Sequence, residues 1–309
     1  MTPLRIGTRA SVLARVQSSM VAGVLAAELS RDVELVTVTT VGDVSDQPLT
    51  EFGGQGVFVS ALRDALLRGE VDVAVHSLKD LPTAPAHGIV LAAVPLREDP
   101  RDVLVARDGL TLGELPRGAL VGTGSPRRTA QLNALGLGLE VVPIRGNVDT
   151  RLSRVADGSV DAVVLARAGL ARLGQLELVT EALDPLQMLP APGQGALAVE
   201  CRASDPGLAA ELGRLLDDFP TREAVAAERS LLATLEAGCT APVGGLAEVV
   251  DGGDGDEIWL RAVVADVSGR PLIRSSATGR PGHAEQIGRE LAEAMLADGA
   301  AEIVKEPVS

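Results

Sequence analysis

The hydrophobic and polar positions predict strands alternating with helices up to about residue 218. Near-continuous apolar runs such as 71–75 are typical of buried parallel strands. The predicted strands cover residues 4–7, 34–40, 71–75, 119–122, 140–144 and 160–165. Helices are predicted over 11–29, 57–68 and 148–157. On the first helix, we expect one buried apolar stripe: Val12, Leu13, Val16, Met20, Val24 and Leu25.

Two stretches of the sequence repeat each other. Residues 6–11 (IGTRAS) resemble 121–125 (VGTGS), and residues 69–75 (GEVDVAV) resemble 158–164 (GSVDAVV). Two similar α/β domains would explain both repeats, and convergent patterning of strand–helix turns is the alternative.

The spacing of Pro and Gly, together with a change of pattern near residue 218, predicts three domains. The Pro- and Gly-rich stretches 95–103 and 189–196 look like two chain crossings, hence a hinge. A helix over 221–236, strands over 246–250, 257–266 and 271–277, and a helix over 282–298 then indicate a smaller α+β domain. The predicted domains are 1–96 with 197–216 (α/β), 102–190 (α/β) and 219–309 (α+β).

Composition narrows the classes of function. The net charge is −14, aromatic residues make up 1% of the 309 residues, and there is no Tyr, which argues against nucleic-acid binding. No apolar run is long enough to cross a membrane, and the N-terminus lacks a signal-peptide pattern. Two cysteines form no disulfide framework, so we expect a cytoplasmic protein. His76 and His87 lack metal-ligand spacing, so no metal is predicted.

Polar clusters follow several predicted strands directly. They are 8–11 (TRAS), 76–80 (HSLKD), 123–128 (TGSPRR) and 145–147 (RGN). In open α/β sheets, ligands bind beyond the carboxyl ends of the strands. The clusters therefore favour a cleft shared by the first two domains, and ordinary polar surface loops are the alternative.

Arg127 and Arg128 are placed unusually for arginines. Ser125 and Pro126 predict a helix start, with Ser125 as the cap, so both arginines fall in the first turn. Cations there oppose the helix dipole at a cost of about 0.3–1 kcal/mol each. Charge-assisted bonds to a bound carboxylate, about 1.5–3 kcal/mol each, would outweigh that cost. The alternative is a pair of solvated arginines, but Arg9, Arg145 and Arg151 at comparable positions favour an anion site.

Three further residues are candidates for chemistry. Lys79 is one of two lysines in a chain otherwise rich in Arg; it is either required as a compact ammonium or present by chance. Asp80 could stabilise a cation in a cleft, or serve as a cap or salt-bridge partner. Cys239, in a Gly-containing loop after a helix, could be a nucleophile or a small buried side chain, whereas Cys201 is expected to be buried.

The segments HSLKDLP (76–82), GTGSPRR (122–128), RGNVDTRL (145–152), LPAPGQGA (189–196) and EAGCTAPVG (236–244) resemble the signature segments of the porphobilinogen deaminases (hydroxymethylbilane synthases), in the same order. The resemblance covers about residues 4–300. It implies two α/β domains similar to periplasmic binding proteins, joined by a hinge, and a smaller α+β domain. It also implies a transferase that deaminates and polymerises four porphobilinogen molecules into the linear tetrapyrrole hydroxymethylbilane during heme biosynthesis.

The resemblance also implies residue roles. Asp80 is the implied catalytic carboxylate, and Cys239 the implied thioether attachment point of a dipyrromethane cofactor. The other implied cofactor-binding residues are Lys79, Ser125, Arg127, Arg128 and Arg145, with Asp80. The implied substrate-binding residues are Arg9, Ser11, Phe58, Arg145, Arg151, Arg172 and Gln194. An active-site lid is implied at about 42–56, where Glu51 and Gln55 replace lysines usual in the family.

A second hypothesis is a solute-binding protein for small anions without catalysis. Two α/β domains and a hinge would suit it, but it gives no use to Cys239 or to the third domain. On the enzyme reading, the expected partner is porphobilinogen alone, with no nucleic acid or membrane, and the expected state is a monomer.

Overall fold

The structure is a computed structural model that describes residues 2–29, 31–38, 56–237 and 241–305, with the side chains of 56–58 and 305 left out. It forms two compact units, one of residues 1–98 with 196–222 and one of residues 99–195 with 223–309. In the described part of the chain, no helix is long and apolar enough to cross a membrane.

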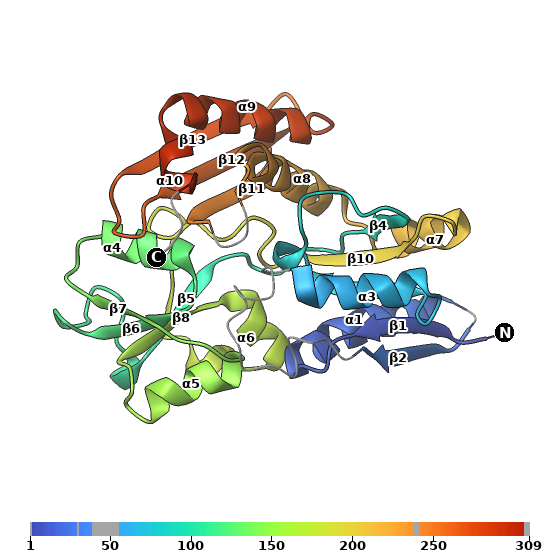
Figure 1. Cartoon of the computed structure of the whole chain (residues 1–309), viewed down its shortest axis with the longest axis horizontal. Helices are drawn as coiled ribbons and strands as arrows, with labels where there is room; N and C mark the ends of the chain where they lie inside the picture. Colours follow the sequence, from blue (N-terminus) through green and yellow to red (C-terminus); the bar gives the residue numbers. More distant parts are fainter. Residues whose placement is uncertain (1, 30, 39–55, 238–240, 306–309) are drawn as a thin grey trace. The chain divides into compact units, whose positions relative to one another are not determined.

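The first unit is built on a five-stranded sheet of order β2-β1-β3-β10-β4 (Figure 1). The strands are β1 (Leu4–Thr8), β2 (Val33–Thr37), β3 (Val73–Ser77), β4 (Ile89–Ala93) and β10 (Leu197–Arg202). Among the strands that the structure describes in this sheet, only β10 runs against the others. The helices α1 (Val12–Glu28) and α7 (Pro206–Leu216) share one core with it, and α3 (Gly56–Leu67) packs into another. Because successive side chains of a strand point to opposite faces, the two cores make three layers.

The second unit contains a sheet of the same design, with order β7-β6-β8-β5-β9. Its strands are β5 (Asp102–Ala106), β6 (Leu120–Thr123), β7 (Glu140–Pro143), β8 (Ala162–Ala166) and β9 (Glu181–Ala182). Here β5 is the strand that runs against its neighbours. The helix α4 (Pro126–Ala134) packs on one face, and α5 (Val148–Ala156) and α6 (Arg167–Leu173) pack on the other (Figure 1).

The internal repeat has a structural cause. Gly7 and Gly122 lie in equivalent strands, and an added Cβ on either would come within 2.9 Å of a neighbouring side chain, Leu62 or Ile144. The aspartates of the second repeat also share a role. Asp72 accepts the backbone N–H of Arg5, and Asp161 accepts that of Leu120, so each carboxylate fixes the start of an adjacent strand.

The second unit also holds a three-stranded antiparallel sheet of β11 (Val243–Asp251), β12 (Asp256–Ala265) and β13 (Leu272–Gly279). The helices α8 (Phe219–Thr234), α9 (Ala284–Ala297) and α10 (Ala300–Lys305) share a core with it. On the other face of the sheet, Leu246, Val263 and Ala265 pack against Ala130 of α4 and against Leu189. Asn133 at the end of α4 donates to the carbonyl of Val267 at 2.7 Å.

The predicted fold class is confirmed: two α/β sheets with helices, and a smaller C-terminal sheet with helices. The three predicted domain boundaries stay a prediction. Elements absent from the prediction are β4, β5, β9, β10, α6, α7 and α10. The strand expected over 71–75 begins two residues later, at Val73.

The predicted apolar stripe of α1 is buried only in part: Leu25 is buried and Leu13 and Val16 are half-buried. Val12, Met20 and Val24 are exposed, whereas the buried set includes Gln17 and Ser18 together with Val21 and Leu25. Gln17 is buried because it exchanges hydrogen bonds with the Ser77 side chain on β3, at 2.9 and 3.3 Å. The face of α1 that meets the sheet therefore combines this polar contact with the apolar packing of Val21 and Leu25.

Candidate active site

One edge of the first sheet gathers the predicted residues of the first unit. Because β1 and β3 are parallel neighbours, the residues that follow them come out at the same edge. Arg9 and Ser11 follow β1, and Ser11 caps α1 by accepting the N–H of Ala14 at 3.3 Å. Lys79 and Asp80 follow β3 in a 3₁₀ turn, η2 (Leu78–Asp80).

Asp80 is half-buried, and within the described ranges its carboxylate has no hydrogen bond or ion pair. The structural alternatives for this residue, a cap or a salt bridge, therefore have no support among the described residues. A carboxylate held at a sheet edge without an internal partner can accept N–H groups from a ligand or stabilise a cation.

A buried charged cluster joins β3, β10 and α3. Glu200 on β10 accepts two hydrogen bonds from Arg63 on α3, at 3.0 and 2.6 Å. Its Oε2 also lies 3.2 Å from Nε2 of His76. Burial alone would raise the pKa of Glu200, but His76 and Arg63 outweigh it and lower the pKa to about 2. The cluster ties α3 to the strand that leads to Asp80.

The corresponding edge of the sheet in the second unit gathers the predicted arginines. The parallel neighbours β6, β7 and β8 end at this edge. Arg127 and Arg128 follow β6, Arg145 and Arg151 follow β7, and Arg172 follows β8 in α6.

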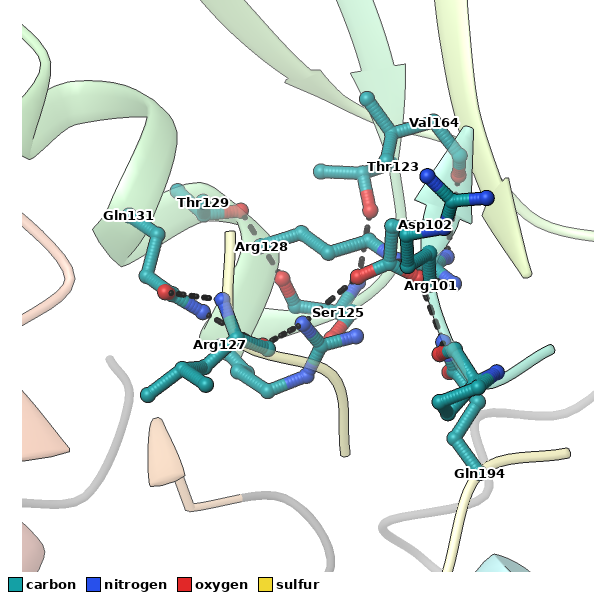
Figure 2. A network of polar contacts seen from close by, with 12 residues as sticks. Arg101, Asp102, Thr123, Ser125, Arg127, Arg128, Thr129, Gln131, Val164 and Gln194 are labelled. Atoms are coloured by element: carbon teal, nitrogen blue, oxygen red, sulfur yellow. Dashed lines mark hydrogen bonds and ion pairs between the residues drawn. The ribbon is translucent and has the colours of Figure 1, made fainter. Parts of the chain in front are cut away.

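Asp102 holds Arg127 and Arg128 (Figure 2). The Nη1 of Arg127 donates to Oδ2 of Asp102 at 2.7 Å and to the carbonyl of Leu189 at 2.6 Å. The Nε and Nη2 of Arg128 donate to Oδ1 of Asp102 at 3.2 and 2.8 Å, and its Nη1 donates to the carbonyl of Val164. Arg127 and Arg128 are 4% and 5% exposed, so the alternative of two solvated arginines is wrong.

The charges of this group do not cancel. Burial alone would raise the pKa of Asp102, but Arg127 and Arg128 outweigh it and hold the pKa well below its usual range. Burial and the charge of Arg128 lower the pKa of Arg151, so a third cation lies close by. Two guanidiniums on one carboxylate, with the guanidinium of Arg151 near Arg128, leave excess positive charge, which favours a bound anion.

The other predicted residues of the second unit vary in their surroundings. Ser125 stands at the cap position of α4, but its side chain makes no capping bond, so the capping prediction is wrong in that respect. Gln194 is buried and donates to Asp102 at 2.8 Å and to the carbonyl of Pro100 at 2.7 Å. Arg172 donates to the carbonyl of Gly195, and Arg151 to that of Gly146. Arg145 is exposed, with no side-chain partner among the described residues.

Several predicted positions fall outside the described part. Cys239 lies outside it, as do residues 42–55 of the predicted lid, including Glu51 and Gln55. Phe58 lies in α3, but its side chain is not described. Across the residues that are described, no group of three or more His, Cys, Asp and Glu side chains could hold a metal ion. Cys201 is fully buried, as expected, and burial raises its thiol pKa to about 11.

Sequence reasoning missed Asp102. It opens the buried strand DVLVA, and a carboxylate at the start of such an apolar run needs a partner when buried. That need was a usable signal, although only the fold could show that Arg127 and Arg128 meet it.

Family models and curated relatives that match nearly the whole chain carry the same name. A family model described as "Porphobilinogen deaminase, dipyromethane cofactor binding domain" matches residues 4–210, and "Porphobilinogen deaminase, C-terminal domain" matches 222–297. The porphobilinogen deaminase of Nocardia farcinica is 59% identical over 310 residues, covering 99% of this chain and 89% of the relative. That of Mycobacterium avium is 58% identical over 306 residues, covering 97% of this chain and 96% of the relative. Among solved structures, the VFT2 domain of Bordetella pertussis BvgS matches with a TM-score of 0.44 and 17% identity, covering 74% of this chain and 91% of that one.

Proposed function

Because the chain belongs to the porphobilinogen deaminase family, we propose that it is a transferase that joins four porphobilinogen molecules into hydroxymethylbilane. Each addition forms one carbon–carbon bond and releases one ammonia, and water releases the finished tetrapyrrole. The observation that carries this proposal is the match to both family models, which together span residues 4–210 and 222–297. The second model is that of the family's C-terminal domain, for which the solute-binding alternative has no use.

The described residues fit a dipyrromethane cofactor. Its side chains are carboxylates, and the arginines at the start of α4 carry more positive charge than Asp102 neutralises. The Nε of Arg127 is buried and has no hydrogen-bond partner within the described residues, so it can donate to an added acceptor. When bound through a thioether to Cys239, the cofactor supplies the free pyrrole carbon to which substrate is joined.

Asp80 is the proposed catalytic residue. Its carboxylate, without an internal partner among the described residues, can accept the pyrrole N–H of a substrate ring. It can also stabilise the positive charge that develops when ammonia departs, because a fixed carboxylate needs no reorganisation at that moment. Lys79, next to it, is proposed to bind a carboxylate.

The proposed substrate-binding residues serve the two carboxylates that each porphobilinogen brings. They are Arg9, Ser11, Phe58, Arg145, Arg151, Arg172 and Gln194. Arg145 is the most accessible of the described arginines at the β7 end, since it is exposed and makes no ion pair there. Ser125, Arg127 and Arg128 are assigned to the cofactor.

The proposal also covers the location, the oligomeric state, the partners and the domains of the enzyme. We propose a cytoplasmic monomer that acts on a small molecule, with no nucleic-acid or membrane partner, and with the three domains at 1–96 with 197–216, 102–190 and 219–309. A lid at 42–56, with Glu51 and Gln55 in place of lysines, would bring less positive charge to the substrate than lysines would.

The test is turnover of porphobilinogen by the purified protein. Ammonia release and tetrapyrrole formation are measured together, and four ammonia molecules are expected for each tetrapyrrole. Binding of porphobilinogen without ammonia release, by a protein shown to carry its cofactor, would favour the solute-binding alternative.

A further inference from the structure

Asp102 occupies an unusual place in the second unit. It is the first residue of β5, is fully buried, and pairs in register with Ala166 at the end of β8. It therefore lies at the same edge as the arginines that follow β6. Its two oxygens accept four side-chain hydrogen bonds, from Arg127, Arg128 and Gln194 (Figure 2).

The two arginines use their donors differently. A guanidinium has five N–H donors. Arg128 has bonds from all three of its nitrogens, to Asp102 and to the Val164 carbonyl. Arg127 bonds only through Nη1 among the described residues, and its Nε is buried without a partner. The geometry thus anchors Arg128 and leaves one side of Arg127 for a ligand.

We propose that Asp102 is a positioning residue that orients Arg127 toward an anionic ligand, with Arg128 and Gln194 completing the support. The proposal rests on the proposed function, in which that ligand is a carboxylate of the dipyrromethane or of the growing pyrrole chain. Leu189 extends the support, because its carbonyl also accepts from Gln131, and its backbone N–H donates to the same side chain.

Orientation and charge make opposite predictions for Asp102→Asn. The change removes one negative charge beside two arginines, so charge alone predicts tighter binding of a carboxylate. It also places an amide NH₂ against guanidinium donors, so loss of orientation predicts weaker binding. The sign of the change in affinity therefore separates a positioning residue from a simple counter-charge.

The experiment compares Asp102→Asn with wild type, using protein whose cofactor content has been determined by intact mass. Because Arg127 is assigned to the cofactor, to whose free pyrrole each porphobilinogen is joined, misplacing Arg127 misplaces the group that substrate must meet, and we expect the KM for porphobilinogen to rise about tenfold or more. An unchanged or lower KM in the folded variant would overturn the proposal.

Asp161→Asn is the matched control. Like Asp102, Asp161 pairs with an arginine, in its case Arg107, and it accepts the backbone N–H of Leu120. It lies before β8, at the other end of that strand. This variant is expected to lower the melting temperature and leave KM within about twofold of wild type. If both variants shift KM equally, the effect of Asp102 is general destabilisation and the proposal fails.

A second variant covers the case in which Asp102→Asn does not fold. Gln194→Met removes one donor from Asp102 without changing the charge, and we expect a smaller rise in KM; an unchanged KM would count against the positioning network.

If wild-type protein with its cofactor releases no ammonia, the proposed function fails instead. Equilibrium binding of porphobilinogen to the same variants then still tests whether Asp102 orients Arg127.

Discussion

Arg127 and Arg128 lie in the first turn of α4, where the helix dipole disfavours cations. The sequence predicts that a bound carboxylate offsets this cost, but the structure shows an internal one, Asp102. A bound carboxylate stays a prediction, which the excess charge of Arg127, Arg128 and the nearby Arg151 over Asp102 supports.

Asp80→Asn tests the proposed catalytic role of the Asp80 carboxylate. The amide keeps the size of the side chain but loses the charge that would stabilise a cationic transition state. We expect kcat to fall about 100-fold or more, with the mass of the cofactor retained. Ammonia release and intact mass are the measurements, and near-normal turnover would remove Asp80 from the mechanism.

Arg145→Ala tests the accessible arginine after β7. Because Arg145 has no side-chain partner among the described residues, its removal should leave the melting temperature unchanged. We expect KM for porphobilinogen to rise about tenfold, as when one charge-assisted contact is lost. Arg154→Ala, an exposed arginine on α5, is the control and should change neither quantity. Equal effects of the two changes would mean that Arg145 has no specific contact with substrate.

At this scale, the sequence could identify residues that carry chemistry but not their partners. The order TGSPRR after a strand correctly places Arg127 and Arg128 in the first turn of a helix. Nothing local could reveal Asp102 as their partner, because it lies 25 and 26 residues away and arrives through the pairing of β5 with β8.

At the scale of elements, polar contacts join helices to the sheets beside apolar packing. Gln17 of α1 bonds to Ser77, on the same face of the helix that buries Val21 and Leu25, while Val12, Met20 and Val24 are exposed. On the opposite face of the same sheet, Arg63 brings α3 to Glu200. Both contacts end on or beside β3, the strand that leads to Asp80.

Glu200→Gln tests the second contact. The folded pKa of Glu200, about 2, lies below the ordinary 4.5, so the carboxylate stabilises the fold above the ordinary value. This contribution is lost as the pH falls from 4.5 toward 2. We expect the variant to be about 3 kcal/mol less stable near pH 7, because it breaks a buried ion pair.

The measurement is the thermal midpoint of wild type and Glu200→Gln as a function of pH. The difference between the two should be largest at neutral pH and shrink in acid. Glu70→Gln, which removes only an exposed pair with Arg68, is the control and should show little effect. A difference for Glu200→Gln that is constant with pH would mean that its charge does not stabilise the fold.

Strand and helix periodicity predicted the elements within each domain better than the strands that follow the two predicted chain crossings. Strands β1, β6 and β7 and helices α3, α5 and α8 agree with the prediction to within about two residues. The strands β5 and β10 were missed because each follows a Pro- or Gly-rich crossing, which the sequence pattern marks as irregular. Yet each becomes the antiparallel strand of its sheet.

At the scale of the whole molecule, the repeat in the sequence corresponds to two sheets of the same design, in which β6, β7 and β8 take the places of β1, β2 and β3. Asp72 and Asp161 perform the same task in the two sheets, which local patterning by chance would not require. The net charge of −14 would repel an anionic substrate at long range, so binding has to depend on local arginines.

This charge predicts how the rate depends on salt. Initial rates with porphobilinogen should rise with ionic strength, because salt screens the repulsion, until the salt weakens the arginine contacts. Initial rates over a salt series are the measurement, and a steady fall from the lowest salt would contradict the prediction.

The most direct test of the whole account is the intact mass of the purified protein beside that of Cys239→Ser. A wild-type mass greater than the sequence mass by two linked pyrrole units, with the excess absent from the variant, is the predicted result. A variant that keeps the added mass would contradict attachment at Cys239. A wild-type protein that stays at its sequence mass even after incubation with porphobilinogen would contradict the assignment of the cofactor.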